Sequence, residues 1–256
     1  MKVVGIIPAR AASSRLPGKL LLAETGKPLL QYTWEAATRS QRLSEVIVAT
    51  DCEEIFKAVT AFGGRAEMTG EHASGTDRIA EVARRSCPGA EILVNIQGDE
   101  PELDPQQIDL LVGTLSSQPG TEMATLAAPI RSREVLDDPA CTKVVCAKDG
   151  RALYFSRAAI PFCRDAGPEE VAQLLKINSP WKLHLGVYAY RREFLLKLTE
   201  IPPSPLERLE KLEQLRALEI GATIQVAIVE HYAVGIDTPA DYAQFVARMK
   251  TASRAA

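Results

Sequence analysis

The stretch that decides the fold is VVGIIPARAASSRLPGK, residues 3–19. It begins with a short, mostly β-branched apolar run at residues 3–7, which is typical of a strand buried on both faces. The loop that follows carries three cations, Arg10, Arg15 and Lys19, among small residues that let a backbone approach a ligand. Open α/β sheets bind their ligands where such a strand ends. The stretch therefore predicts an anion site, although a solvated turn would also explain its charges.

Further along the first half of the chain, strand patterns alternate with helix patterns. Such alternation indicates βαβ units and predicts an α/β protein with a mostly parallel, twisted sheet. Strands are expected over residues 3–8, 45–49, 65–68, 92–96 and 123–129, and helices over residues 29–39, 53–62, 76–85 and 105–115.

The rhythm changes from about Thr142. KVVCAKDGRALYFSR, residues 143–157, predicts two strands around an Asp-Gly turn. KLHLGVYAYRR, residues 182–192, predicts a strand with His184, Gly186, Tyr188 and Tyr190 on one face. The segment between them, residues 161–180, is expected to be a loop with a short helix. We expect an inserted, smaller antiparallel subdomain over residues 142–221, and an α/β core formed by residues 1–141 and 222–256.

SPLERLEKLEQLRALEIG, residues 204–221, predicts a single helix with Ser204 as its N-cap and Gly221 as its stop. Its leucines recur every three residues, so each lags the helical turn by about 60° and the apolar stripe winds around the helix. Such a helix would be packed on two sides. Glu213 and Gln214 could then point into a cleft or lie on a solvated face. A last strand over residues 223–229 and a helix over residues 239–249 are expected to complete the core.

Composition excludes several classes of function. The 256 residues are 46% hydrophobic and 25% charged with a net charge of −3, which fits a globular protein and argues against a nucleic-acid partner. No apolar stretch is long enough to cross a membrane, and none resembles a secretion signal. The five cysteines form no CxxC pair, so reduced thiols and a cytoplasmic location are expected.

Carboxylates follow two of the predicted strands. NIQGDEP, residues 95–101, places Gln97, Asp99 and Glu100 past a buried strand, and GIDTP, residues 235–239, places Asp237 between a strand and a helix. One or two carboxylates with water and phosphate oxygens are the usual ligands of Mg²⁺ in nucleotide sites. Either aspartate could instead cap the helix that follows it.

GEHASGTDR, residues 70–78, places Ser74, Gly75 and Thr76 at a predicted helix start, where free N–H groups could read a base edge or hold an anion. A simple helix cap would account for the same residues. The chain has neither a GxxxxGK[ST] loop nor a GxGxxG fingerprint, which disfavours kinases and dehydrogenases.

Eight motifs together resemble one family. IPARAASSRLPGK, VATD, GEHASGTDR, NIQGDEP, LYFSRAAIP, HLGVYAYR, SPLERLEKLEQLRALEIG and GIDTP occur in this order. They resemble the 3-deoxy-manno-octulosonate (Kdo) cytidylyltransferases over residues 3 to about 245. The resemblance implies a Rossmann-like, three-layer fold of the nucleotide-diphospho-sugar transferase type. It also implies transfer of a cytidylyl group from CTP to Kdo for lipopolysaccharide biosynthesis, with release of pyrophosphate.

The resemblance also implies roles for individual residues. Arg10 and Lys19 would hold the triphosphate with Arg15 in the same loop, and Asp99 and Asp237 would bind Mg²⁺; we expect Arg10, Lys19, Asp99 and Asp237 to carry catalysis. Cytosine would be read near Ala9 and by the turn Ser74, Gly75 and Thr76. The sugar-binding residues would be Gln97, Arg157, His184, Tyr188, Glu213 and Gln214.

Alternatives remain at this point. The same chemistry could act on 8-amino-Kdo or a sialic acid, and the fold could belong to a silent nucleotide-binding protein, which the presence of both aspartates and both phosphate cations disfavours. His184 could act as a general base, although sugar binding suits it better. A homodimer is expected, because the subdomain has apolar surface to bury.

Overall fold

The computed structural model describes residues 1–10 and 15–255, and within them the chain forms two compact units. Unit 1 comprises Met1–Asp109 and Ala233–Ala256, and unit 2 comprises Leu110–Tyr232. The predicted subdomain over residues 142–221 falls within unit 2. This unit also contains two strands expected in the core: Met123–Pro129 pairs antiparallel with Lys182–Arg191, and Ile224–Ile228 pairs in parallel with Met123–Pro129.

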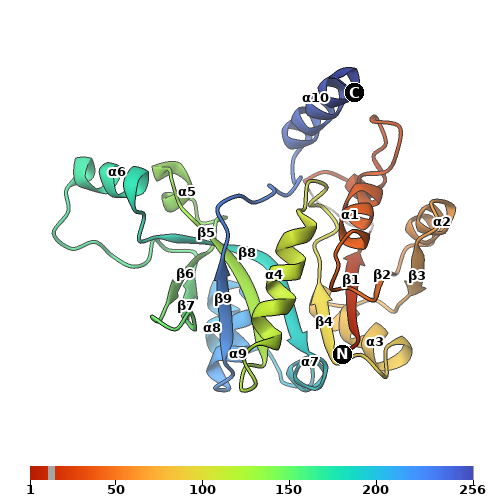
Figure 1. Ribbon diagram of the computed structural model, residues 1–256, viewed down its shortest axis with the longest axis horizontal. Helices are drawn as coiled ribbons and strands as arrows, with labels where there is room; N and C mark the ends of the chain where they lie inside the picture. Colours follow the sequence, from red (N-terminus) through yellow and green to blue (C-terminus); the bar gives the residue numbers. More distant parts are fainter. Residues whose placement is uncertain (11–14, 256) are drawn as a thin grey trace. The chain divides into compact units, whose positions relative to one another are not determined.

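Unit 1 is built on a parallel sheet (Figure 1). Its strands are β1 (Val3–Ala9), β2 (Glu45–Thr50), β3 (Arg65–Met68) and β4 (Ile92–Asn95). They lie in the order β3-β2-β1-β4, and every neighbouring pair is parallel. All four strands were predicted to within two residues at each end. For β1, β2 and β4 the signal was a continuous apolar run, which is typical of strands covered on both faces.

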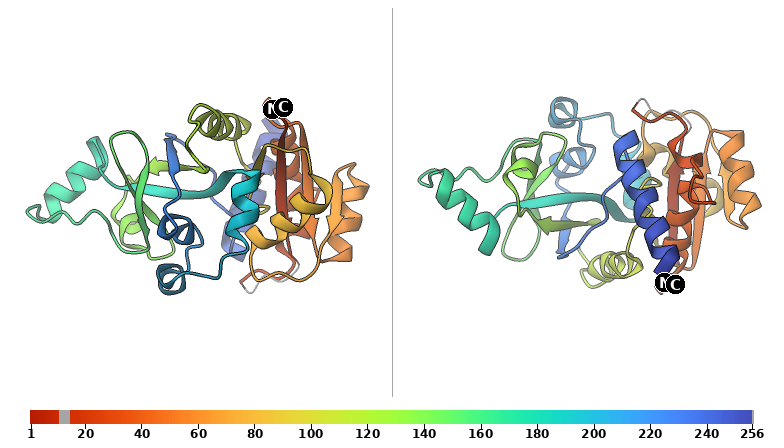
Figure 2. Two further views of the ribbon diagram at one scale, coloured as in Figure 1. Left: turned by 90° about the horizontal axis from the view of Figure 1, so that it is seen from below. Right: turned by 90° about the horizontal axis from the view of Figure 1, so that it is seen from above.

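Helices cover both faces of this sheet. They are the 3₁₀ helix η1 (Lys19–Leu21), α1 (Leu29–Thr38), α2 (Glu53–Ala61), α3 (Gly75–Ser86) and α10 (Pro239–Ala255). Because parallel crossovers are right-handed, α1 and α2, which step toward β3, cover one face, and α3, which returns to β4, covers the other. Helix α10 packs on α1 through Leu29, Tyr242 and Phe245 (Figure 2). This contact brings the C-terminal segment beside the first loop.

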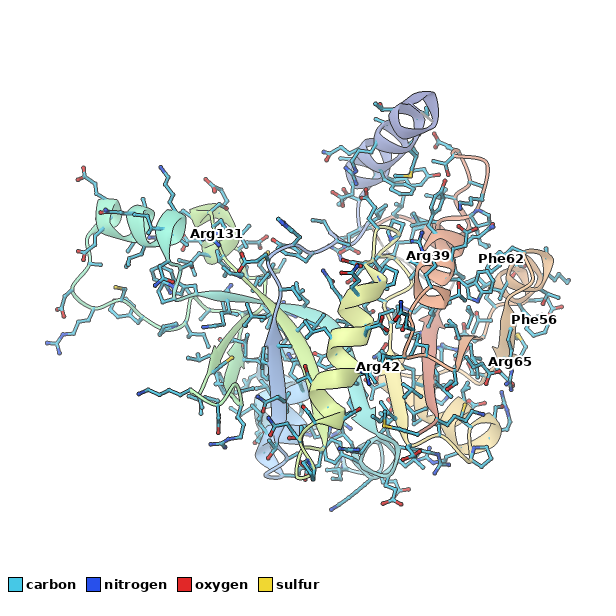
Figure 3. All side chains as sticks on the ribbon, in the orientation of Figure 1. Arg39, Arg42, Phe56, Phe62, Arg65 and Arg131 are labelled. Carbon is cyan, nitrogen blue, oxygen red and sulfur yellow. The ribbon has the colours of Figure 1, made fainter. Side chains whose placement is uncertain are left out.

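The exposed edge of the parallel sheet is protected by charge. The short edge strand β3 carries Arg65, whose guanidinium lies 2.5 Å from Glu45 of β2 and 2.6 Å from Glu67 (Figure 3). Charged side chains on a short edge strand oppose pairing with another chain. Of the four strands of unit 1, β3 is the one that is not buried.

Unit 2 contains a mixed sheet. Its strands are β5 (Met123–Pro129), β6 (Lys143–Cys146), β7 (Ala152–Ser156), β8 (Lys182–Arg191) and β9 (Ile224–Ile228). Strand β5 pairs with β9 in parallel and with β8 in antiparallel orientation, and β6 pairs antiparallel with β7 and β8. The predicted Asp-Gly hairpin is confirmed, with Gly150 at φ 84°. The α/β class and the parallel sheet with an antiparallel extension are thus confirmed.

The helices of unit 2 are shorter. They are the C-terminal part of α4 (Pro105–Ser116), then α5 (Arg133–Asp137), α6 (Pro168–Ile177), α7 (Arg192–Leu198), α8 (Pro205–Glu210) and α9 (Gln214–Glu219). Helices α5 and α7 were not predicted, because one or two turns leave too short an apolar period. Leu136 of α5 and Leu175 of α6 pack on Trp181, and these two helices lie together in Figure 1.

The prediction of one helix over residues 204–221 is wrong. The helix breaks at Lys211, which has a left-handed backbone with φ 55°. In a continuous helix Glu207 and Arg216 would lie on opposite sides, about 13.5 Å apart along the axis. The break instead lets them form a buried two-point pair at 2.6 and 2.7 Å. The predicted N-cap at Ser204 is confirmed and forms a capping box with Glu207, and Gly221 follows the second helix with φ 81°.

Candidate active site

Two carboxylates from distant parts of unit 1 meet at one ammonium group. Lys19 Nζ lies 2.5 Å from Asp99 Oδ2 and 2.9 Å from Asp237 Oδ1. The carbonyl oxygen of Ile236 accepts a third hydrogen bond from the same nitrogen at 2.9 Å. Asp99 and Asp237, which the resemblance assigns to one metal ion, therefore lie together beside a cation of the first loop.

The backbone explains why these segments meet. The Ile236 N–H donates to the Asp99 carbonyl oxygen at 2.9 Å, and the Ile236 side chain is buried against α1 and α10. On the other side, buried Thr33 of α1 donates to the Gly98 carbonyl oxygen at 3.0 Å. A side chain at Gly98 would meet Ile7 and Leu30 at 3.2 and 3.3 Å, so glycine allows this loop to pack closely. Apolar packing thus fixes the carboxylates.

Neither aspartate caps a helix. For α4, Asp104 accepts the hydrogen bond from the Gln106 N–H at 2.9 Å. For α10, Thr238 accepts from the Asp241 N–H, and the Asp241 carboxylate accepts in return from the Thr238 N–H. The capping alternatives are therefore wrong, and both carboxylates face the cations instead.

The charges at this point are closely balanced. Burial lowers the pKa of Lys19, but attraction and hydrogen bonds to Asp99 and Asp237 outweigh the burial and raise it above its ordinary value. Arg15 pairs with the second Asp237 oxygen at 2.9 Å. Burial and the charge of Asp99 raise the pKa of Glu100 to about 8. Of the adjacent carboxyl groups in NIQGDEP, Asp99 is thus the one that pairs with the cation.

The predicted nucleotide-binding residues lie around the same strand ends. Ala9 is the buried last residue of β1, and Arg10 follows it with an exposed side chain. Ser74 is the N-cap of α3 and accepts from the Asp77 N–H at 3.1 Å. A side chain at Gly75 would lie 3.3 Å from Pro8, so the start of α3 packs directly against the end of β1. The small residues Ala11–Ser14 of the predicted anion loop lie outside the described residues.

Sequence reasoning assigned no role to the residues that hold this helix start. Arg78, only 3% exposed, lies 2.5 Å from Asp51 at the end of β2 and donates to the Thr69 hydroxyl and the Gly70 carbonyl oxygen. Glu81 accepts from the Gly70 N–H at 3.0 Å. Both Asp51 and Arg78 end quoted motifs, VATD and GEHASGTDR. A charged residue at the close of each motif was the signal that could have identified them.

Five of the predicted sugar-binding residues belong to unit 2, whereas Gln97 follows β4 in unit 1. His184 and Tyr188 lie on one face of β8 as predicted, with ring centroids 5.4 Å apart. Thr125 hydrogen-bonds to His184 Nε2 at 3.0 Å and to the Val187 carbonyl oxygen at 2.8 Å. A hydroxyl has one proton, and the carbonyl takes it, so Nε2 donates and Nδ1 is left as an acceptor. Burial lowers the pKa of His184 to about 3, so its ring is neutral.

Two further predicted sugar-binding residues, Glu213 and Gln214, lie where α9 begins after the break that follows α8. Glu213 occupies the N-cap position of α9, and Gln214 begins that helix. The Gln214 side chain is 5% exposed, and its Nε2 atom has no hydrogen-bond partner within the described part of the chain. A buried amide without a partner is costly, which suits a group that a ligand satisfies. Burial, followed by the charges of Tyr190 and Glu213, raises the pKa of Tyr188, so its hydroxyl keeps its proton.

Arg157 follows β7 and is bound on two sides. Its Nε donates to the Glu210 carbonyl oxygen at 2.7 Å and its Nη1 to the Pro139 carbonyl oxygen at 2.9 Å. Nη2 reaches the Lys211 carbonyl oxygen at 3.5 Å. No carboxylate of the described residues lies within 4.0 Å of the guanidinium. Two of its five N–H groups and its full charge therefore remain for a ligand.

Comparisons with known proteins agree with this geometry. The sequence profile of the cytidylyltransferase family matches residues 4–224. A 3-deoxy-manno-octulosonate cytidylyltransferase of Rhodopirellula baltica is 50% identical over 254 residues, which are 98% of this chain and 100% of that protein. A protein of the same name from Geobacter sulfurreducens is 45% identical over 257 residues, again 98% and 100% of the two chains.

A solved structure is also similar. CMP:2-keto-3-deoxy-manno-octonic acid synthetase in complex with CTP superposes with a TM-score of 0.89 at 40% identity, covering 98% of this chain and 99% of that one. In the described residues no helix is long and apolar enough to cross a membrane. The chain belongs to the 3-deoxy-manno-octulosonate cytidylyltransferase family.

Proposed function

We propose that the protein transfers the cytidylyl group of CTP to Kdo, forming CMP-Kdo and pyrophosphate for lipopolysaccharide biosynthesis. The observation that carries the proposal is the meeting of Asp99 and Asp237 at Lys19, beside the first loop. Full-length similarity to a synthetase solved in complex with CTP supports the same chemistry. Ala9, Ser74, Gly75 and Thr76 would bind the cytidine end of the nucleotide.

The two aspartates fit Mg²⁺. Asp99 Oδ2, Asp237 Oδ1 and the Ile236 carbonyl oxygen all lie within 2.9 Å of one point, the Lys19 nitrogen. Oxygen donors of this kind suit a hard cation, and the described residues add no further acidic, histidine or cysteine ligand that would favour Zn²⁺. When bound, the metal would supply positive charge to the phosphate oxygens. Asp99 and Asp237 are the residues that would hold it.

The transfer is an in-line displacement at phosphorus. The anomeric 2-hydroxyl oxygen of Kdo bonds to the α-phosphorus of CTP while the bond from that phosphorus to the bridging oxygen breaks. The hydroxyl proton is released and pyrophosphate leaves. Arg10, Arg15 and Lys19 would orient the triphosphate and neutralise the leaving group, which are the main demands of phosphorus-centred transfer.

Unit 2 supplies groups that suit an acidic sugar. The guanidinium of Arg157 has no carboxylate partner among the described residues, so it can pair with the carboxylate of Kdo. The neutral His184 ring offers Nδ1 as an acceptor for a sugar hydroxyl. With a pKa of about 3, His184 is too weak a base to be the principal proton acceptor. Gln97, Tyr188, Glu213 and Gln214 would complete the sugar contacts.

We place the enzyme in the cytoplasm, where CTP is made, and propose that it acts as a homodimer. The five cysteines all lie in the described residues and none of them forms a disulfide bond, which fits a reducing compartment. A solution mass that corresponds to one chain would contradict the dimer.

The function is tested by following pyrophosphate during incubation with CTP, Kdo and Mg²⁺. We expect release that requires all three components and that Asp99→Ala abolishes. Competition between Kdo, 8-amino-Kdo and a sialic acid at equal concentration then measures the preferred acceptor. If the wild type releases no more pyrophosphate than Asp99→Ala, the proposed reaction is refuted. If more CMP-sugar forms from another acid than from Kdo, that acid is the substrate.

A further inference from the structure

We propose that Glu210, which lies outside the predicted sugar-binding set, is the residue that positions Arg157 for the sugar acid. This inference rests on the proposed function, because it concerns the residue assigned to the carboxylate of Kdo. Glu210 is the last residue of α8, and Arg157 directly follows β7. Both belong to unit 2.

The contacts bind both the backbone and the side chain of Arg157 to the same residue. The two Glu210 carboxylate oxygens accept hydrogen bonds from the Ser156 hydroxyl at 2.6 Å and from the Arg157 N–H at 3.0 Å. The Glu210 carbonyl oxygen accepts from Arg157 Nε at 2.7 Å. The Glu210 carboxylate therefore fixes the backbone at Arg157, while the Glu210 carbonyl oxygen holds Nε. The carboxylate does not reach the guanidinium, whose charge stays unpaired.

The far side of the guanidinium is bound to a turn that is itself held rigid. Arg157 Nη1 donates to the Pro139 carbonyl oxygen at 2.9 Å. The fully buried Lys143 donates to the carbonyl oxygens on either side, Asp138 at 2.9 Å and Cys141 at 2.5 Å. Arg157 thus lies between a fixed turn and Glu210. Replacing the Glu210 side chain removes the carboxylate bonds to the Ser156 hydroxyl and the Arg157 N–H but leaves the carbonyl bond to Arg157 Nε, so the backbone that carries the guanidinium would shift.

A guanidinium that loses its fixed orientation binds a carboxylate more weakly. A guanidinium binds a carboxylate through two parallel N–H···O bonds, and only a fixed orientation presents both donors together. Long side chains also lose conformational freedom when they bind, and a preformed arginine has already lost it. Glu210 would therefore act on sugar affinity, while the nucleotide contacts of unit 1 remain unchanged.

The test compares three variants by the KM for Kdo, the KM for CTP, kcat and the melting temperature. Glu210→Leu removes both carboxylate acceptors and keeps the carbonyl oxygen; it should raise the KM for Kdo about tenfold, with the KM for CTP changed less than about twofold. Glu210→Gln keeps an oxygen for the Arg157 N–H, and its amide can donate to the Ser156 hydroxyl oxygen. It should restore the KM for Kdo to within about threefold of the wild type.

Glu219→Leu is the matched control. Glu219 lies on α9 and accepts from the Leu206 N–H at 3.2 Å, so its loss weakens the same pair of helices without touching Arg157. An equal rise in the KM for Kdo in this variant, or an unchanged KM in Glu210→Leu, would overturn the positioning role while wild-type turnover still supports the proposed reaction. If the wild type itself does not use Kdo, both the proposed reaction and the inference fail.

Discussion

The backbone N–H of Ile236 donates a hydrogen bond to the carbonyl oxygen of Asp99 at 2.9 Å. This bond joins the loop after β4 to the segment before α10, and the burial of Ile236 in the α1–α10 contact holds it in place. It sets the spacing of the neighbouring Asp99 and Asp237 carboxylates. The meeting of the two carboxylates at Lys19 is therefore a consequence of apolar packing at the C-terminal end of the parallel strands.

Replacing either aspartate should abolish metal binding. Asp99→Asn and Asp237→Asn each replace a negatively charged carboxylate by a neutral amide, which cannot balance the charge of a divalent cation. We expect kcat to fall at least about 100-fold, and Mn²⁺ affinity measured by calorimetry to fall in parallel. Asp104→Asn is the control, because Asp104 caps α4 and asparagine is an equally good cap. Retained Mn²⁺ binding in both active-site variants would place the metal elsewhere.

Lys19 should oppose the metal as well as bind phosphate. Its nitrogen contacts the same Asp99 and Asp237 oxygens that a metal would use, and two cations cannot share them at these distances. Lys19→Met should therefore tighten Mn²⁺ binding without nucleotide about tenfold, while it weakens CTP binding. Arg15→Met, which removes a more exposed cation from Asp237, should have a smaller effect on the metal. Unchanged Mn²⁺ affinity in Lys19→Met would contradict this competition.

The pair of Arg78 and Asp51 should carry a large part of the stability of unit 1. Arg78 is 3% exposed and Asp51 is partly buried, so the loss of Arg78 leaves a partly buried carboxylate without its partner and takes away the donor to Thr69 and Gly70. Arg78→Met should lower the free energy of unfolding by about 3 kcal/mol in urea titrations. Arg65→Met is the matched control, because Arg65 also contacts two glutamates but at an exposed edge strand (Figure 3), and it should cost less than about 1 kcal/mol. An equal loss of unfolding free energy in the two variants would contradict the claim that burial makes the pair of Arg78 and Asp51 more stabilising.

Regular patterns allowed much of the fold to be predicted from the sequence. Local sequence patterns were enough to predict the continuous apolar strands β1 and β4 and the Asp-Gly hairpin. The loop motifs at Lys19, Asp99 and Asp237 together indicated one site. The break at Lys211 was not predictable, because it is driven by a pair between Glu207 and Arg216 that exists only once the two helices have folded back. Spacing alone favours the unbroken helix.

The supporting residues were missed for the same reason. Arg78 and Glu210 act through partners far away in the sequence, Asp51 and Arg157. The ends of the two motifs mark Asp51 and Arg78 one by one, but no local pattern shows that they pair. The capping alternatives for Asp99 and Asp237 also needed coordinates, because Asp104 and Thr238 compete for the same helix starts in the sequence.

The neutral, buried His184 should make the protein acid-sensitive. Burial lowers the pKa of His184 to about 3, below the ordinary value of 6.5, so the unfolded chain binds a proton that the folded protein excludes. Above pH 6.5 the ring is neutral in both states, and the folded protein keeps its full stability. As the pH falls from 6.5 toward 3, only the unfolded chain binds a proton at His184, so the free energy of unfolding decreases. Between pH 7 and 5 the free energy of unfolding of the wild type should fall by about 2 kcal/mol more than that of His184→Gln, measured by urea unfolding at each pH.

His231→Gln is the control, since His231 is exposed. Parallel stability curves for the wild type and His184→Gln would contradict a buried neutral ring.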